Sequence, residues 1–362
     1  GDHRKRVLVM AARSSWEGLK EATKKSFAKH ILFRRRICKM VSKEEAGPRE
    51  EEPGGDHRKR VLVIGGTQFM GRHTVEALLA ARWRVCTLNR GKTPSFAVVE
   101  QQFVCDRFAD RAEVRRVVQE CGPWDCVIDF VAFSAEDARD AMGASRYLYV
   151  SSDSVFMAGD RDVIEARRNK GLVESDCRRE TRRSAKGALR RRNGYQFRYG
   201  SGKLEIEEEL ARWPEVWSTS IRLPDVIGPY DNLDGFLGLC ERLRNGRKTV
   251  GCAVPGADEK HRASVAFAPD VAAALTLLAG LQERPPPVMH LACVERPSVA
   301  ELVGLVSDAL GRPPPALDPT KRAPILTVDI GPLDISLALT TLHPWRPTAL
   351  KEAVRRTVQW YE

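Results

Sequence analysis

The chain has 362 residues, a net charge of +11 and nine cysteines, and its length suits one large or two modest domains. No apolar run is long enough to span a membrane, and no secretory signal is visible. The cysteines form no CxxC pair and have no histidines at metal-ligand spacing, so we expect no metal site and a reduced, cytoplasmic location.

Two segments hold most of the positive charge. Residues 1–39 contain 12 Lys or Arg and 3 Asp or Glu, and residues 167–192 contain 11 and 3. Each block is interpreted as a solvated tail or loop, and the rest of the chain is mildly acidic. The first block also has the composition of a transit peptide, which would place the protein in a plastid or mitochondrion. An RNA-binding role for the second block is the competing interpretation.

The stretch GDHRKRVLV occurs at residues 1–9 and again at 55–63. Only the second copy continues into a glycine-rich turn, so we interpret it as the first strand of the fold. Residues 1–54 are predicted to be a disordered or targeting-like extension that carries a duplicated segment. Met40 could be the natural start.

From residue 60 onward, strands and helices alternate. We predict strands at 61–64, 85–88, 103–105, 126–131, 147–150 and 218–223, with helices at 111–120 and 202–212 between them. This order predicts an α/β fold, a doubly wound parallel Rossmann-type sheet over residues 55–225. Residues 226–362 are predicted to form a smaller C-terminal α/β domain that binds the substrate. Within it, Ser298 and Glu301 form a capping box, and a last helix starts near Thr348.

The first strand is followed by GGTQFMG, a loop typical of dinucleotide binding. Gly65 suits the tight turn, and Gly71 lets the next helix pack closely. At the end of the second strand stand Asn89, Arg90 and Lys92, where an acidic residue would bind the ribose of NAD. A guanidinium suits a 2′-phosphate, so NADP is the preferred cofactor and NAD the alternative. Asp106, just after the third strand, is placed to bind the adenine amino group.

A second motif is YGSGK. Tyr199 and Lys203 lie four residues apart and share one face of a helix. A neighbouring ammonium is expected to lower the pKa of the phenol, which makes Tyr199 a candidate general acid or base for interconversion of a hydroxyl and a carbonyl. The strand at 147–150 runs into the polar residues 151–154, at the edge of the sheet where this fold binds ligands.

With these motifs the chain resembles the extended short-chain dehydrogenase/reductase superfamily, in its NAD-dependent epimerase/dehydratase branch. GGTQFMG is similar to the GGTGFIG loop of that family, YVSSDSVF to its catalytic Ser/Thr strand, YGSGK to its Tyr-x-x-x-Lys, and RLPDVIGPYD to its RPxNVYGP segment. The resemblance covers residues 57–362 and includes the C-terminal segments HLACVERPSVAELVGLVSDALG and LHPWRPTALKEAVRRTVQWY.

The resemblance implies a role for individual residues. Tyr199 would be the acid or base, Lys203 would hold the nicotinamide ribose, and Ser152 would orient the substrate hydroxyl. The implied cofactor-binding residues are Gly65, Gly66, Gln68, Phe69, Met70, Gly71, Asn89, Arg90, Asp106, Phe130, Lys203 and Pro224. The implied substrate-binding residues are Asp153, Asp225 and Arg262, the last by meeting a substrate diphosphate.

Several positions depart from the family pattern. Gln68 replaces the middle glycine, so a side chain is expected at the pyrophosphate. This loop and Ile128-Asp129-Phe130 are typical of an atypical subgroup that includes relatives of plastid stem-loop RNA-binding proteins. The segment 133–147 is short for a helix that usually supports dimerisation, so a monomer or weak dimer is expected. Ser152 and Tyr199 are 47 residues apart, a wider spacing than usual in the family.

We therefore expect an NAD(P)-dependent oxidoreductase or epimerase acting on a hydroxyl or keto carbon of a nucleotide-sugar-like small molecule. Dehydration is less favoured, because Ser154 stands where a glutamate would act as the base. The competing hypotheses are an RNA-binding protein related to the plastid group and a non-catalytic cofactor-binding scaffold. No membrane association is expected.

Overall fold

The computed structural model describes residues 58–94, 99–168, 170–231, 234–254, 257, 261–326 and 328–362, without the side chains of 183–193 and 234. The predicted extension at 1–54 lies outside these residues. Among the described helices, none is long and apolar enough to cross a membrane.

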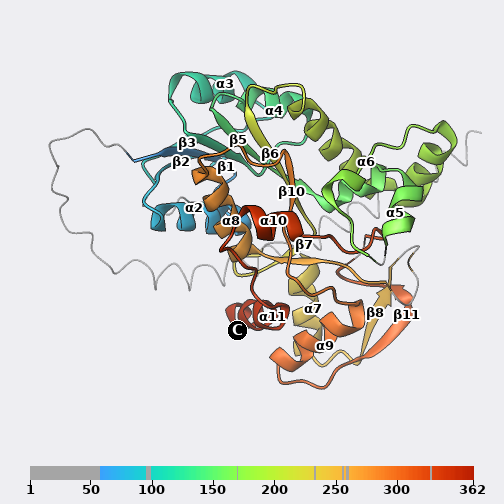
Figure 1. Ribbon diagram of the computed structural model, residues 1–362. Coiled ribbons are helices and arrows are strands. Elements are labelled where there is room, and N and C mark those ends of the chain that lie inside the picture. The colour runs from blue at the N-terminus through green and yellow to red at the C-terminus, as the bar shows by residue number, and fades with distance from the viewer. Residues whose placement is uncertain are drawn as a thin grey trace, which may run out of the picture. The chain divides into compact units, whose positions relative to one another are not determined.

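A seven-stranded sheet carries the fold (Figure 1). Its strand order is β10-β6-β5-β4-β1-β2-β3, and every neighbouring pair is parallel. This confirms the predicted Rossmann-type sheet. The strands are β1 (Arg60–Ile64), β2 (Arg84–Asn89), β3 (Gln101–Val104), β4 (Cys126–Asp129), β5 (Arg146–Ser152), β6 (Trp217–Leu223) and β10 (Val288–His290). The chain reverses direction across the sheet between β1 and β4, and ligands of such sheets bind at that point.

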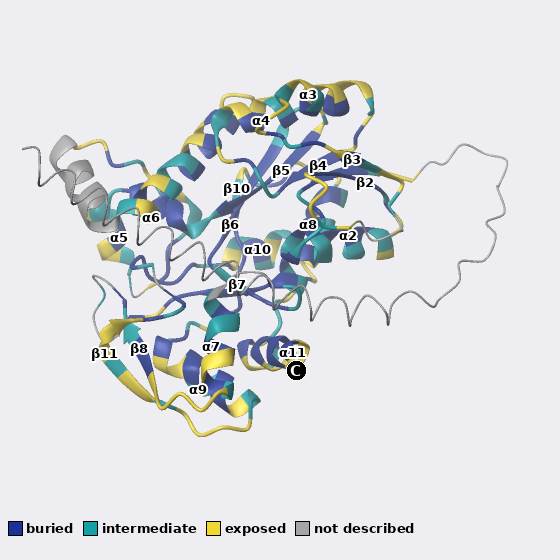
Figure 2. Cartoon of the chain, turned by 180° about the vertical axis from the view of Figure 1, so that it is seen from behind, coloured by how far each residue is buried: buried dark blue, intermediate teal, exposed yellow. Residues whose placement is uncertain are grey.

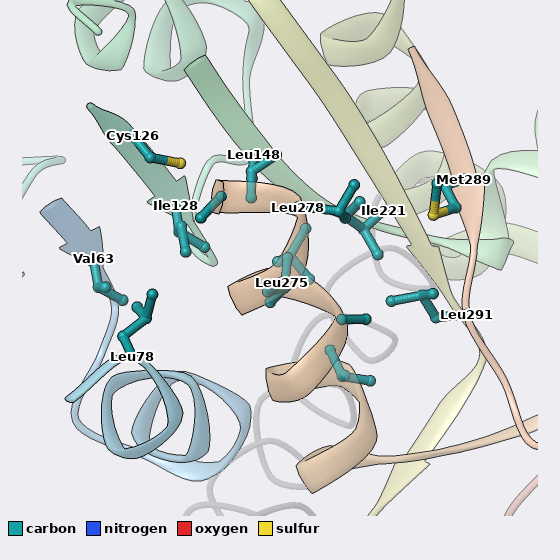
Figure 3. Close-up of a cluster of buried hydrophobic side chains, with 14 of the residues drawn as sticks. Val63, Leu78, Cys126, Ile128, Leu148, Ile221, Leu275, Leu278, Met289 and Leu291 are labelled. Carbon is teal, nitrogen blue, oxygen red and sulfur yellow. The ribbon is translucent and has the colours of Figure 1, made fainter. Parts of the chain in front are cut away.

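The central strands are mostly apolar and almost entirely buried, because helices cover both faces of the sheet. One face carries α2 (Phe69–Ala80), α8 (Ala268–Gly280) and α10 (Ser336–Thr341), and the other carries α3 (Arg111–Glu120), α4 (Ala135–Ala141) and α6 (Arg183–Leu210). In the first core, strand side chains meet those of α2 and α8 (Figure 3); examples are Val63, Ile128, Leu148, Ile221, Leu78, Leu275 and Leu278. Strand β4 ends two residues earlier than predicted, because the Asp129 carboxylate accepts the backbone N–H of Val131.

A second set of elements follows β6 and has its own apolar core. It consists of β7 (Asp225–Ile227), α7 (Asp234–Arg244), β8 (Thr249–Ala253), β9 (Val265–Phe267), α9 (Val299–Ala309), β11 (Ala316–Arg322) and α11 (Leu350–Tyr361). Strand β7 pairs with β9, and β8 pairs with β11. The residues of β11 are mostly exposed (Figure 2). The capping box of Ser298 and Glu301 is present at the start of α9. Strand β10 and helices α8 and α10 come from residues 226–362 but pack with the main sheet, so the division at residue 225 stays a prediction.

The segment between β5 and β6 is more helical than the sequence indicated. It contains η1 (Asp153–Ala158), α5 (Arg161–Arg167), η2 (Glu174–Asp176) and α6. The helix predicted at 202–212 begins at Arg183 and is interrupted at Gly194, whose φ of 43° is non-helical. The loop interpretation of residues 167–192 is therefore wrong for their last part. No proline interrupts residues 183–193, and Ala, Leu, Lys and Arg there are good helix formers.

Arginines of the basic block pair with carboxylates of the chain itself. Arg168 pairs with Asp329 and Glu165, and Arg179 pairs with Glu208. Arg182 contacts three carboxylates, those of Asp160, Asp162 and Glu180. These ion pairs neutralise charge that an RNA backbone would otherwise meet. The side chains of Arg190, Arg191 and Arg192 lie outside the described residues.

Candidate active site

The turn after β1 has the backbone form that a dinucleotide loop requires. Gly65 has a φ of +90°, a region that side chains disfavour. A Cβ atom on Gly71 would lie 2.1 Å from the carbonyl oxygen of Gly65, so only glycine lets α2 start this close to β1. No side chain caps the first turn of α2, which leaves its N–H groups available to an anion such as a pyrophosphate.

Three of the side chains between these glycines, those of Gln68, Phe69 and Met70, have defined surroundings in the structure. Phe69 is buried, and Met70 packs against the core on the α2 face. The Gln68 side chain extends to the segment after β2, where its Nε2 donates a hydrogen bond of 2.6 Å to the Thr93 hydroxyl. The Gln68 side chain is thus directed toward the segment after β2, and the contacts of Gln68, Phe69 and Met70 with a pyrophosphate stay predictions.

The end of β2 contains a buried amide with unused hydrogen-bonding capacity. Both amide atoms of Asn89 are buried and have no hydrogen-bond partner among the described residues. Arg90, next in the chain, is exposed. Asp106 is half-buried, and its Oδ1 accepts the N–H of Phe108 at 3.1 Å. Since buried polar groups are normally satisfied, Asn89 fits a site that a polar ligand such as a ribose completes.

The edge of the sheet next to this loop brings together β5 and α6. Ser152 is the last residue of β5, and its Oγ accepts the N–H of Ser154 at 3.1 Å. Tyr199 interacts with the hydroxyl of Ser152. Lys203 is buried, and its Nζ donates to the carbonyl oxygens of Ala132 (3.2 Å) and Val150 (3.1 Å). The residues of the two motifs thus meet, although 47 residues separate Ser152 from Tyr199.

Close packing of α6 against η1 makes this meeting possible. A Cβ atom on Gly200 would lie 1.7 Å from the carbonyl oxygen of Ser154, inside any allowed contact distance. Gly200 therefore lets the helix approach the turn that follows Ser152. Gly202 in the same motif has more room, because its Cβ would meet only the carbonyl oxygen of Phe133, at 3.7 Å.

The expected effect of Lys203 on Tyr199 is not found. Burial raises the pKa of Tyr199 to about 12, with further contributions from Tyr195 and Asp153, while the Ser152 hydroxyl acts in the opposite direction. Burial lowers the pKa of Lys203 to about 8, against the opposing effect of Asp129. The lysine ammonium is directed at two backbone carbonyls instead of at the phenol oxygen. Tyr199 is therefore a protonated phenol at neutral pH, and its role as an acid or base stays a prediction.

The sequence model of the NAD dependent epimerase/dehydratase family matches residues 61–291. The chain belongs to this family. It is 30% identical to a 2′-dehydrokanamycin reductase of Streptomyces kanamyceticus over 70% of this chain and 67% of that protein. It is 26% identical to a dTDP-4-dehydro-6-deoxy-D-allose reductase of Streptomyces sp over 84% and 96% of the two chains.

Solved structures of the family share the fold. The UDP-glucose 4-epimerase of Thermus thermophilus in complex with NAD has a TM-score of 0.63 and 21% identity, over 83% of this chain and 98% of that chain. MoeE5 in complex with UDP-glucuronic acid and NAD also has a TM-score of 0.63, at 19% identity, over 83% and 98%. The family assignment supports an enzyme, and these relatives give no support to an RNA-binding protein.

The other predicted site residues lie on several segments of the chain, and all but Arg262 follow or end strands of the main sheet or begin the element after one. Phe130 lies beside Gly65, close to the nucleotide loop, and Pro224 is buried directly after β6. Asp153 begins η1, and Asp225 begins β7. Arg262 instead pairs with Glu301 at the start of α9 and donates to the carbonyl oxygen of Arg296, so its contact with a substrate diphosphate stays a prediction.

A buried network that the motifs did not indicate connects β5, α6 and β6. Glu207, one turn after Lys203, accepts a 2.6 Å hydrogen bond from Ser151 and forms a buried ion pair with Arg222 of β6 at 2.7 Å. Arg222 also donates to the carbonyl oxygen of Glu174. The sequence signal that could have indicated Glu207 was its i, i+4 spacing from Lys203, which places both residues on one face of α6. This network ties α6 to β5 and β6, next to Ser152.

Proposed function

We propose that the protein is an NADP-preferring oxidoreductase that reduces a carbonyl group of a sugar-like substrate, with Tyr199 as the proton donor. The observation that carries the proposal is the meeting of Ser152, Tyr199 and Lys203 at the sheet edge that also presents the nucleotide loop. A bound nicotinamide cofactor supplies the hydride. The side chains described here supply binding, orientation and the proton.

The protonation state of the site favours the direction of reduction. As hydride reaches a carbonyl carbon, negative charge develops on the oxygen, and a phenol with a pKa of about 12 remains protonated and donates to it. The Ser152 hydroxyl is within reach of the same oxygen, because it interacts with the Tyr199 phenol. Both curated relatives described above are named as reductases, which supports this direction.

The preference for NADP rests on the end of β2. Asn89 offers an unsatisfied amide, and the exposed Arg90 follows it in place of a carboxylate. Gln68 and Thr93 add a hydrogen-bonded bridge between the nucleotide loop and the segment after β2. A guanidinium here suits a 2′-phosphate, and the nearby polar groups suit a ribose. NAD is the alternative, since the structural neighbours hold NAD.

Epimerisation is a second candidate, supported by the fold shared with a UDP-glucose 4-epimerase. The same groups serve it if the oxidised substrate stays bound and is reduced on its other face. A nucleotide sugar remains the proposed substrate type, because two of the neighbouring proteins, MoeE5 and a UDP-glucose 4-epimerase of Thermotoga maritima, were solved with UDP-sugars. Product analysis after incubation with cofactor separates the two reactions: reduction consumes NADPH, whereas epimerisation has no net consumption.

Replacement of Tyr199 by Phe tests the proposal. We expect NADPH-dependent reduction of keto sugars, followed at 340 nm, to fall about 10²–10⁴-fold, because only the proton-donating hydroxyl is lost. NADPH affinity measured by calorimetry should stay within about twofold of the unmodified protein, a difference of roughly 0.4 kcal/mol.

Tyr195→Phe is the matched control. Tyr195 is 67% exposed, and its ring is stacked on that of Tyr199, so its variant also loses one hydroxyl from the same aromatic pair. It should retain activity. Equal activity of Tyr199→Phe and Tyr195→Phe would contradict the assigned role, and absence of any hydride transfer by the unmodified protein would contradict the proposed function.

A further inference from the structure

Two carboxyl groups leave neighbouring strands at the same edge of the sheet. Ser152 pairs in register with Leu223, so Asp153, the next residue after β5, and Asp225, two residues after Leu223, emerge side by side. Asp153 Oδ1 accepts a hydrogen bond from Ser152 Oγ at 3.3 Å. Asp225 Oδ2 accepts the N–H of Leu326 at 2.7 Å. Both carboxyls therefore have a fixed place beside the residue that interacts with Tyr199.

Burial is the main influence on the ionisation of both carboxyl groups of this pair. Burial, followed by the charge of Asp225, raises the pKa of Asp153 to about 8, and burial raises the pKa of Asp225. None of the main influences on either carboxyl is a Lys or Arg of the described residues. From α6 the titratable groups are Tyr199 and, one turn further, Lys203, whose ammonium is directed at the carbonyls of Ala132 and Val150.

One member of the pair is particular to this chain. Asp225 stands where the RPxNVYGP segment of the family has asparagine, so the site carries a carboxyl group in place of a neutral amide. Because Asp153 is buried and two ionised carboxylates beside each other repel, Asp153 keeps its proton near pH 7. A cation placed between the two groups stabilises their ionised forms and forms charge-assisted hydrogen bonds with them. A primary ammonium has the donors for such contacts.

We propose that Asp153 and Asp225 bind an ammonium group of the substrate beside the carbon on which Tyr199 acts, so that the protein prefers an amino sugar to its neutral counterpart. This inference rests on the proposed function and narrows its substrate class. The 30% identical relative is named as a 2′-dehydrokanamycin reductase, so kanamycin is a suitable probe for this inference.

Binding of an ammonium has a thermodynamic signature here. Near pH 7 Asp153 is protonated, since its pKa is about 8. A bound cation stabilises the carboxylate and lowers that pKa, so binding releases up to about one proton. A neutral sugar in the same place releases none.

The test uses matched probes with the full chain and NADPH present. UDP-glucosamine is compared with UDP-glucose, and kanamycin with fully N-acetylated kanamycin, by calorimetry at pH 7 in phosphate and in Tris. Each amine should bind about 10–100-fold more tightly than its neutral partner, with the observed heat differing between buffers as proton release requires. Asp225→Asn, which keeps an oxygen for the Leu326 N–H, should remove most of that preference.

Glu205→Gln is the charge-matched control, because Glu205 is exposed on α6. It should leave the amine preference unchanged, and thermal melting shows whether each variant is folded. The proposal is overturned if no amine binds more tightly than its neutral partner, if Asp225→Asn keeps the preference, or if Glu205→Gln removes it as well. Hydride transfer to neutral keto sugars without amine preference would leave the proposed function standing and this inference refuted.

Discussion

At the scale of single residues, burial determines the protonation states of the site. It lowers the pKa of Lys203 to about 8, raises that of Asp153 to about 8 and raises that of Tyr199 to about 12. In each case desolvation disfavours the charged form. Near neutral pH the site therefore holds a protonated phenol and a protonated Asp153.

The raised pKa of Asp153 makes stability depend on pH. The folded protein binds the proton of the Asp153 carboxyl group more tightly than the unfolded chain does. The stabilisation of the folded state by this protonation is therefore fully present below about pH 4 and is lost as the pH rises to about 8. Asp153→Asn does not titrate. Its melting temperature should therefore exceed that of the unmodified protein by at least ~2 °C at pH 9.

The difference in melting temperature between Asp153→Asn and the unmodified protein should shrink toward pH 4. Scanning calorimetry at both pH values measures it, with Asp308→Asn on the exposed side of α9 as the control. A difference that is independent of pH would show that Asp153 titrates normally in the folded protein.

Arg90 is expected to select between cofactors. In the unmodified protein NADPH should bind more tightly than NADH, and Arg90→Ala should weaken NADPH binding by about 1.5–3 kcal/mol through loss of a charge-assisted contact. NADH affinity should change little. Arg312→Ala, which removes another exposed arginine, is the control. Equal affinities of the two cofactors for the unmodified protein would refute the preference.

At the scale of elements, the close approach of α6 to η1 positions Tyr199, the proposed proton donor, and the two glycines of YGSGK contribute differently to this approach. Gly200→Ala should push the helix away from Ser154, with a fall in melting temperature and at least ~10-fold lower hydride transfer from a misplaced Tyr199. Gly202→Ala has room for its methyl group and should be tolerated, or stabilise the helix by up to ~1 kcal/mol. Similar losses for both variants would contradict this account.

At the scale of the whole molecule, the described sheet and the three largest apolar cores are built from residues 60–361. Residues 57–362 form one compact unit by themselves. Deletion of residues 1–54 should therefore leave a folded protein with unchanged NADPH affinity. Circular dichroism melting and calorimetry on the shortened and full chains test this. A shortened chain that is insoluble or melts much lower would show that the first residues contribute to folding.

The sequence by itself determined six of the seven strands of the sheet, the nucleotide loop and the Tyr-Lys pair, because each depends on local spacing, whereas strand β10 was not predicted. Buried strands are short apolar runs, the loop needs glycine at 65 and 71, and residues at i and i+4 share a helix face. Helix 111–120 was predicted with the bounds found in α3. The family resemblance, carried by the same short motifs, was confirmed.

Only the tertiary structure decided which groups face one another. The pairing of Ser152 with Leu223 brings Asp153 beside Asp225, and no spacing along the chain indicates this. The buried contact of Glu207 with Ser151 and Arg222 depends on three separate elements. The direction of the Tyr199 pKa shift was predicted wrongly, because proximity of a lysine in sequence does not show where its ammonium points or how much water the phenol loses. Burial and long-range contact are properties of the packed chain, so they followed only from the fold.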